Sequence, residues 1–437
     1  MSQPNLTEDP VQKLFFKYLA PSISATLVTS IYILADTVMI GRGVGAIGIA
    51  ALNLLLPLFS LYFGTGLLFG VGGGVLLSIS KGRGDERGAR EYFTMALFCS
   101  AVMSVFYVAG SHIFFDPLTR LLGRNDSMSV YVEEYGRILV SGAPVFLFSS
   151  FLQAFVRNDK APKLSMAAVV TGGISNVILD YIFIFPFGMG MAGGALASVI
   201  GSGLTVLILL SHFFSPANTL KTVRTLKLRK CREIFVNGVP SFLIELSNGI
   251  VVFLFNRQLL AYAGDLGVVV YGIISNSTLI VSSIGNGISQ AAQPIMATNF
   301  GAGRRERVMS TRKLAELTAA AAGILFLAIG VCAPLLVIEV FVRPTEEIIH
   351  MAVPAVRIYF ISYLAVGLNI LYSTYFQSTM KSGFAMVICL LRGIILNGIL
   401  VFILPLVWGV TGIWMTIVAA EFMTLAVCWW LRAKKAG

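Results

Sequence analysis

Hydrophobic residues in this chain come in long blocks, not in the alternating or amphipathic stripes of soluble proteins. A helix needs about 20 apolar residues to cross the hydrocarbon core of a bilayer. By that measure the sequence predicts twelve membrane spans, and therefore an all-α polytopic membrane protein. The spans run approximately over Leu14 to Ile40, Ala51 to Ser80, Phe93 to Phe115, Tyr135 to Phe155, Leu164 to Phe185, Gly190 to Phe214, Phe235 to Tyr262, Val268 to Ala297, Leu314 to Val342, Ala352 to Ser378, Phe384 to Val407 and Gly409 to Leu431.

Composition agrees with this pattern, since 57% of the 437 residues are hydrophobic and only 12% are charged. The net charge is +11, and the Lys and Arg residues are distributed unequally between the two sides of the predicted membrane. Of the 32 Lys and Arg, 24 lie in the N-terminal region, in alternate loops and at the C-terminus, whereas the opposite loops hold four. By the positive-inside rule both termini are expected in the cytoplasm. The basic balance therefore records membrane topology, and no nucleic-acid partner is expected.

Several function classes lack their motifs. "GVGAIG" at residues 43 to 48 fits a dinucleotide pattern but lies between two membrane helices, with no strand before it. There is no phosphate-binding G-x-x-x-x-G-K-[ST] loop, the three histidines have no metal spacing, and the five cysteines have no paired spacing. A membrane-embedded enzyme would need a cluster of catalytic polar residues near one membrane surface, and we find none in the sequence. We expect no enzymatic activity, no cofactor and an energy source in an ion gradient.

The chain contains a predicted internal repeat. A basic segment, residues 215–232, separates six spans on either side. "SKGRGDERGAR" at residues 80 to 90 resembles "NFGAGRRERVM" at residues 299 to 309, and Asn176 matches Asn397 at nearly the same offset. Because each half has an even number of spans, the repeats are parallel and their pseudo-two-fold axis lies along the membrane normal. We predict two six-helix lobes, residues 1–214 and 233–437, joined by a cytoplasmic loop.

Four acidic residues lie deep in predicted spans, where a charge costs about 2.5–3.5 kcal/mol even on lenient insertion scales. They are Asp36, Asp180, Glu245 and Glu421.

Two of these acids are expected to share a polar pocket in the first lobe. Asn176 and Asp180 are four residues apart and so lie on one helical face, with Ser198 a short hairpin away. Asp36 closes the first span, which Pro21 is expected to bend. Two carboxylates in such a pocket require either a proton or a hard cation such as Na⁺. The alternative is that each is a single packing residue bonded to backbone.

The second half lacks both acids, since Asn256 is the counterpart of Asp36 and Val401 that of Asp180. Any paired-carboxylate ion site is therefore expected in the first lobe alone. Glu245, grouped with Ser241 and Asn248 on one face of the seventh span, is a candidate for substrate or ion contact, and these two residues and Asn256 are candidates with it. The alternative is a salt bridge, with Arg392 as a conceivable partner, and Glu421 is open to function or structural pairing.

Several stretches resemble the multidrug and toxic compound extrusion family along essentially the whole chain. They are "ADTVMIG", "FVRNDKAPKLSM", "NVILDYIFIFPFGMGMAGGALASVIG", "GVPSFLIE" and "QAAQPIMATNFGAG". The resemblance implies a V-shaped pair of six-helix bundles that exports amphipathic, often cationic, drugs and dyes in exchange for H⁺ or Na⁺.

By position, Pro21 and Asp36 match the family's bending proline and first-helix acid. Asn176, Asp180 and Ser198 match its cation-binding residues, although Ser198 stands where a threonine is often found. Glu245 lies a few residues before the seventh-helix glutamate of several branches, so that residue's role is not transferred.

The sequence thus predicts a multidrug antiporter of the bacterial cytoplasmic membrane, whose partners are small-molecule drugs or dyes and the lipid bilayer. A monomer is expected, although the sequence does not fix the oligomeric state, the drug spectrum or the choice of coupling ion. A lipid-linked precursor flippase of the same superfamily is the alternative.

Overall fold

A computed structural model describes residues 5–434, and within that range every regular element is a helix. The first half contains α1 (Val11–Gly43), α2 (Ala46–Gly82), α3 (Glu86–Ile113), α4 (Phe115–Leu121), η1 (Asp126–Met128), α5 (Ser129–Ser141), α6 (Ala143–Asn158), α7 (Pro162–Ile184), α8 (Gly190–Leu210) and η2 (Ser211–Phe214). The second half contains α9 (Leu228–Gly301), α10 (Arg305–Cys332), α11 (Pro334–Glu339), α12 (Glu346–Phe360), α13 (Tyr363–Ser378), α14 (Ser382–Leu390), the π-helix η3 (Leu391–Ile395) and α15 (Leu396–Ala433).

The twelve predicted spans are present among residues 5–434. Eight continuous helical segments are long and apolar enough to cross a membrane, and two bent pairs, α5 with α6 and α12 with α13, make ten. Two of the eight segments are double, because Gly264 interrupts α9 and Gly409 interrupts α15 with positive φ angles of 61° and 55°. A left-handed conformation ends a helix and favours glycine. The breaks fall where the sequence predicted the spans to end.

The backbone repeats the duplication that the sequence predicted. Residues with positive φ recur at an offset of 219 to 221 as Gly45 with Gly264, Gly84 with Gly303, Lys160 with Met380, and Gly188 with Gly409. Positive φ is uncommon outside glycine, so its repetition at Lys160 and Met380 is the more telling match. The two halves therefore turn at the same places.

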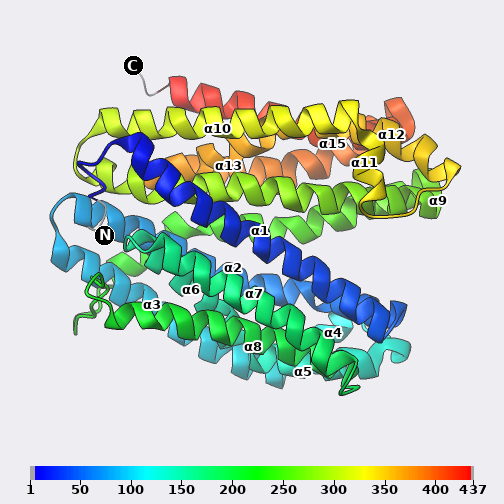
Figure 1. Ribbon diagram of the computed structural model, residues 1–437, viewed down its shortest axis with the longest axis horizontal. Coiled ribbons are helices and arrows are strands. Elements are labelled where there is room, and N and C mark those ends of the chain that lie inside the picture. Colours follow the sequence, from blue (N-terminus) through cyan, green and yellow to red (C-terminus); the bar gives the residue numbers. More distant parts are fainter. Residues whose placement is uncertain (1–4, 435–437) are drawn as a thin grey trace.

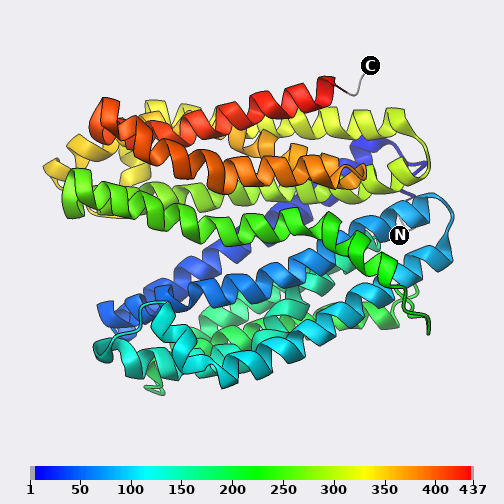
Figure 2. The ribbon, with the colours of Figure 1, turned by 180° about the vertical axis from the view of Figure 1, so that it is seen from behind.

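The helices form two bundles (Figures 1 and 2). Helices α2 to α8 make one, α10 to α15 make the other, and α9 lies along the side of the second bundle that faces the first. Helix α1 crosses diagonally between them. Its start packs in one apolar core with the second half, where Phe15 and Tyr18 join Ile288, whereas Ile40 near its end belongs to a core of the first half.

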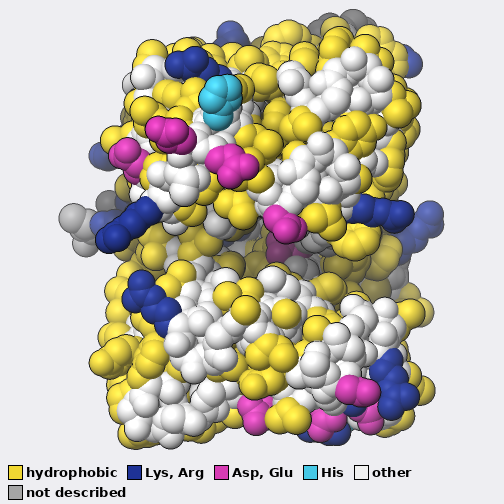
Figure 3. Space-filling model, turned by 90° about the vertical axis from the view of Figure 1, so that its right-hand side faces the viewer, with side chains coloured by type: hydrophobic (Ala, Val, Ile, Leu, Met, Phe, Trp, Pro, Cys, Tyr) yellow, Lys and Arg dark blue, Asp and Glu magenta, His cyan; other side chains and the backbone are white. Residues whose placement is uncertain are grey.

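The bundles separate at one end and meet at the other. Figure 3 shows a hollow between them at the end that carries the α11 and α12 region. The other end carries loops 83–85, 215–227 and 302–304, and we call it the basic end. Residues at both ends of the described chain lie there, since Arg304 bonds the carbonyl of Thr7 and Arg432 donates to the Tyr372 hydroxyl.

At the basic end, the backbones of α2 and α9 touch across the two halves. A Cβ added at Gly82 would lie 2.0 Å from the carbonyl oxygen of Thr298, and one added at Gly301 would lie 2.0 Å from that of Ile79. Both contacts are far shorter than real Cβ contacts. Gly82 and Gly301 are equivalent positions of the internal repeat, so each half contributes the same contact to the other. We call this contact the glycine seal.

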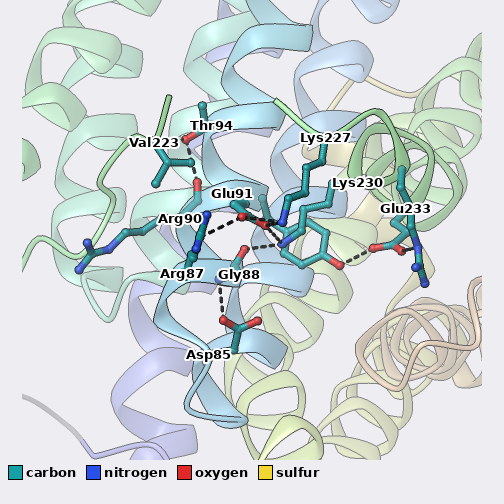
Figure 4. Close-up of polar contacts among 12 residues, drawn as sticks. Asp85, Arg87, Gly88, Arg90, Glu91, Thr94, Val223, Lys227, Lys230 and Glu233 are labelled. Carbon is teal, nitrogen blue, oxygen red and sulfur yellow. Dashed lines mark hydrogen bonds and ion pairs between the residues drawn. The ribbon is translucent and has the colours of Figure 1, made fainter. Parts of the chain in front are cut away.

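Side chains hold the start of α9 onto α3 at the same end (Figure 4). The carboxylate of Glu91 is buried and binds Lys227 at 2.8 Å and Lys230 at 3.0 Å. The Lys230 ammonium also lies 3.9 Å from the centre of the Tyr92 ring, and the Tyr92 hydroxyl donates to Glu233. The segment that joins the halves is therefore fixed to the first bundle by charge pairing.

A second anchor of this segment is the buried carboxylate of Asp159, in the turn after α6. Lys81 and the hydroxyl of Thr219 donate to it, and His212 Nε2 lies 2.7 Å from its Oδ2. Burial alone would raise the pKa of Asp159, but these partners outweigh burial and hold the pKa below its ordinary value. Asp159 thus stays ionised and ties the joining segment, through Thr219, to the first bundle.

Candidate functional site

A cavity opens inside the first bundle among α1, α2 and α5 to α8. It has about 1090 Å³ of empty space, including the part open to solvent. Leu52, Leu55, Phe59, Phe63 and Phe146 form much of its apolar wall. Most of its other wall residues are polar or small, so an apolar wall and convergent polar groups line the same cavity, as in ligand sites.

The predicted cation-binding residues lie at this cavity. Asp36 of α1, Asn176 of α7 and Ser198 of α8 line it, and Asn176 Nδ2 donates to Ser198 Oγ at 3.3 Å. Asp180 lies behind the lining residues, fully buried, and interacts electrostatically with Asp36. Helix α1 thus meets the consecutive helices α7 and α8, which are far from it in the sequence, and the four side chains come together. Their role in binding an ion stays a prediction.

Four oxygens of this group have no hydrogen-bond donor among the described residues. Asp36 Oδ1, Asn176 Oδ1 and both carboxylate oxygens of Asp180 are buried without a partner. Buried polar atoms are nearly always paired, and an ionised carboxylate left alone in apolar surroundings is costly. Carboxylate and amide oxygens are ligands for hard cations, and either carboxylate can take a proton. The donor set therefore fits H⁺ or Na⁺.

Two tyrosines complete the polar surroundings, and the sequence analysis did not identify them. Tyr135 of α5 lines the cavity beside Ser198 and lies near both acids, and Tyr32 of α1 lies near Asp36 and Glu245. Tyr32 is four residues before Asp36, so helical spacing alone could have placed it on the same face. Tyr135 carried no such signal, because none of the predicted cation-binding residues lies within a helical turn of it in the sequence.

Glu245 of α9 also lines this cavity, although it belongs to the second half of the sequence. It reaches the first bundle across Gly64 of α2, where an added Cβ would lie 3.3 Å from the Glu245 Cβ. The three residues predicted as possible contacts together with it lie elsewhere. Ser241 accepts a hydrogen bond from Gln377, Asn248 is exposed, and neither they nor Asn256 line the cavity.

The conceivable pairing of Arg392 with Glu245 is wrong. Arg392 binds Glu421, with Nη2 2.9 Å and Nε 3.2 Å from Oε1, and Asn369 donates to the other carboxylate oxygen at 2.7 Å. Glu421 is therefore engaged in a buried structural pair within the second bundle. The pairing was not predictable because Arg392 stands on the π-helical turn η3, which shifts the faces of the residues after it.

Removing one partner of this pair should destabilise the protein. We expect Arg392→Met to lose about 3–5 kcal/mol, because Glu421 would be left buried and unpaired, and the double variant with Glu421→Met to recover most of that loss. Thermal unfolding of the detergent-purified protein measures both. The exposed Arg357 offers the control Arg357→Met, which should be neutral. Equal melting temperatures for Arg392→Met and Arg357→Met would show that the pair is not structural.

The second bundle is apolar where the first has acids. Val401, the counterpart of Asp180, is fully buried in a core that contains Phe255, Tyr271 and Trp414. The lobes therefore share their turns but not their chemistry.

Pro21 lies buried within α1, and the helix runs from Val11 to Gly43 with no break in its helical backbone there. The expected bend is thus not a break in the helix, and a role for Pro21 in conformational change stays a prediction.

Comparisons with known proteins agree with this architecture. The MatE family model matches residues 21–182 and 240–403, one stretch in each half. The chain is 26% identical over 436 residues to the multidrug export protein MepA of Staphylococcus aureus, covering 96% of this chain and 93% of that protein. It is 25% identical to MepA of Staphylococcus saprophyticus over 421 residues, covering 95% and 92%.

Among solved structures, the fold is similar to an outward-facing conformation of a multidrug resistance MATE family transporter of the MOP superfamily. The TM-score is 0.92 at 22% identity, and the match covers 99% of this chain and 98% of that one. At that identity the similarity concerns the fold, in which twelve helices form two bundles.

Proposed function

This chain belongs to the MatE family, and we propose that it is an antiporter that exports amphipathic, often cationic, organic compounds from a bacterial cell in exchange for H⁺ or Na⁺. The observation that carries the proposal is the set of buried carboxylate and amide oxygens without donors beside a large apolar cavity. The MepA relatives are named as multidrug export proteins, which supports small-molecule drugs as substrates.

In this proposal, Asp36 and Asp180 bind the coupling ion, and Asn176 and Ser198 complete its surroundings. Asp36 lines the cavity and also interacts electrostatically with Asp180. An ion held by the two acids and a cationic compound in the cavity would therefore compete for the same negative charge. Either the ion or the compound can neutralise the negative charge of the site, but binding both together adds little further free energy. Such a site favours exchange over co-transport. Glu245, on the far wall, would contribute a second negative charge to a bound cation.

Access to the site would alternate by a movement of one bundle against the other. The hollow in Figure 3 lies at the end opposite the basic end, and the basic end is cytoplasmic by the positive-inside rule. The structure would then correspond to a state open to the outside. We propose that a change in α1 around Pro21 accompanies ion binding, since α1 carries Asp36 and packs on both bundles.

The lipid-linked precursor flippase is less well supported than the antiporter. Among the described residues that line the cavity, two are acidic and none is Lys, Arg or His. A lipid-linked phosphate substrate would meet repulsion there instead of a counter-charge. An enzymatic function finds no support in membership of a family of transport proteins.

Transport in a defined system tests the proposal. Purified protein in proteoliposomes should move a cationic dye against its gradient when a pH gradient or a sodium gradient is imposed. Driving with each gradient in turn identifies the ion. A dye flux that ignores both gradients, or that equals the leak of liposomes without protein, would show that the protein is not an ion-coupled exporter.

A further inference from the structure

A groove lies at the basic end of the second bundle, between the start of α9 and the turn that joins α13 to α14. Its lining includes Arg229, Arg232 and Val236 from α9, and Lys381, Ser382 and Gly383 from the turn. It shares no lining residue with the cavity, whose Glu245 lies further along α9. The candidate transport site therefore leaves this groove without a role.

The groove is positively charged. Three of its lining residues are cationic and one, Glu233, is acidic. Glu233 is already engaged, because Arg229 Nε lies 3.1 Å from its Oε1 and the Tyr92 hydroxyl donates to Oε2 (Figure 4 shows Glu233). Arg232 is exposed and makes no hydrogen bond or ion pair with any described residue. A full positive charge is thus available to a ligand.

The start of α14 adds to this field. Ser382 is the first residue of α14, and no side chain caps that end of the helix. A helix N-terminus carries partial positive charge and unpaired N–H groups, which favour an anion. The position is fixed, because the Ser382 hydroxyl donates to Asn237 Oδ1 at 2.6 Å.

Apolar side chains are exposed at the same place. Val236 is 50% and Met380 45% exposed, and both line the groove, while the adjoining Phe235 is 51% exposed. Cationic groups at the ends of membrane helices, with exposed apolar groups beside them, are complementary to a molecule that has an anionic head and an apolar tail. At the cytoplasmic surface of a membrane the abundant molecule of that kind is an anionic phospholipid.

We propose that this groove binds the headgroup of an anionic phospholipid, with Arg232 and Arg229 holding the phosphate and the acyl chains lying along Val236 and Met380. The site also bears on the contact between the bundles. Asn237, in the groove lining, donates to the Gly72 carbonyl of α2 at 3.4 Å, and its own carbonyl accepts from Gln377 at 3.0 Å. A bound lipid would therefore stabilise the junction of the two halves. The inference does not depend on the proposed transport function.

Native mass spectrometry of the full-length purified protein, titrated with phosphatidylglycerol or phosphatidylcholine of the same chain length, tests this. The wild type should retain phosphatidylglycerol preferentially. Arg232→Gln should weaken that binding about fivefold, and Arg229→Gln with Arg232→Gln should weaken it further. Arg224→Gln removes the same charge from an exposed position outside the groove and should leave binding unchanged.

A second variant fills the groove without changing its charge. Gly383 has open space where a Cβ would lie, so Gly383→Trp should fold and yet exclude the lipid. Equal losses for Arg232→Gln and Arg224→Gln would show diffuse surface attraction and overturn the proposal. So would equal retention of the two lipids, unaltered binding by Gly383→Trp, or full displacement by glycerol phosphate, which lacks the acyl chains.

Discussion

Asp36→Asn is expected to reduce ion-driven export to the background leak of liposomes without protein, while the variant inserts and folds like the wild type. The amide cannot take up a proton or carry the negative charge that holds Na⁺, so the site loses its exchangeable ion. Folding should survive because Asp36 Oδ1 has no hydrogen-bond partner to lose. Dye efflux from proteoliposomes under the effective gradient measures this, together with thermal unfolding.

Asp180→Asn should behave in the same way, because its carboxylate shares the electrostatic surroundings of Asp36. A matched control is Asp265→Asn, which makes the same chemical change at an exposed position beside the break in α9. That variant should transport normally. Normal gradient-driven efflux by Asp36→Asn would refute the assignment of the ion site, and unfolding of the variant would show that the carboxylate is structural.

The second large effect is expected from Gly301→Leu at the glycine seal. A Cβ there would lie 2.0 Å from the Ile79 carbonyl oxygen, and backbone cannot yield as a flexible side chain does. The helices α2 and α9 must therefore separate at the basic end. We expect transport to fall at least about tenfold, since a barrier that closes one side is needed for alternating access. Gly82→Leu, at the equivalent position, should do the same.

Accessibility of a reporter thiol shows whether the seal has opened. In a variant whose native cysteines are replaced, Ser80→Cys near the seal should be protected from a maleimide in the parent, as Ser80 is only 5% exposed, and should react once Gly301→Leu is added. Gly272→Leu, in the same helix α9 but with open space around it, is the control. If Gly301→Leu transports at the control's rate with the thiol still protected, the contact is not a barrier.

The ion site and the glycine seal belong to the same transport cycle, and a difference between the two lobes suggests how they are coupled. Among the described residues, Asp36 and Asp180 form a pair of buried acids beside a cavity in the first bundle, while the equivalent region of the second is a packed core around Val401. A packed core resists change of shape, whereas a bundle with a polar cavity can respond to the charge it holds. We therefore expect α1 in the first bundle to change conformation when the bound ion is exchanged, and the glycine seal to open in response.

The amino-acid sequence by itself determined the twelve spans, the predicted orientation, the repeat and the candidate acids. Crossing a membrane is a local property, because an apolar stretch of sufficient length must satisfy its own backbone hydrogen bonds as a helix. Even the breaks at Gly264 and Gly409 followed from the ends of the apolar blocks. Helical spacing placed Asn176 and Asp180 on one face for the same reason.

Tertiary structure decided which polar side chains meet. Each residue turns the helix face by about 100°, so a small rotation or a π-helical turn exchanges one partner for another. That is why Arg392 meets Glu421 and not Glu245, and why Glu245 faces the first bundle's cavity. Tyr135 and the glycine seal depend on contacts between helices far apart in the chain, and a single sequence carries no record of such distances.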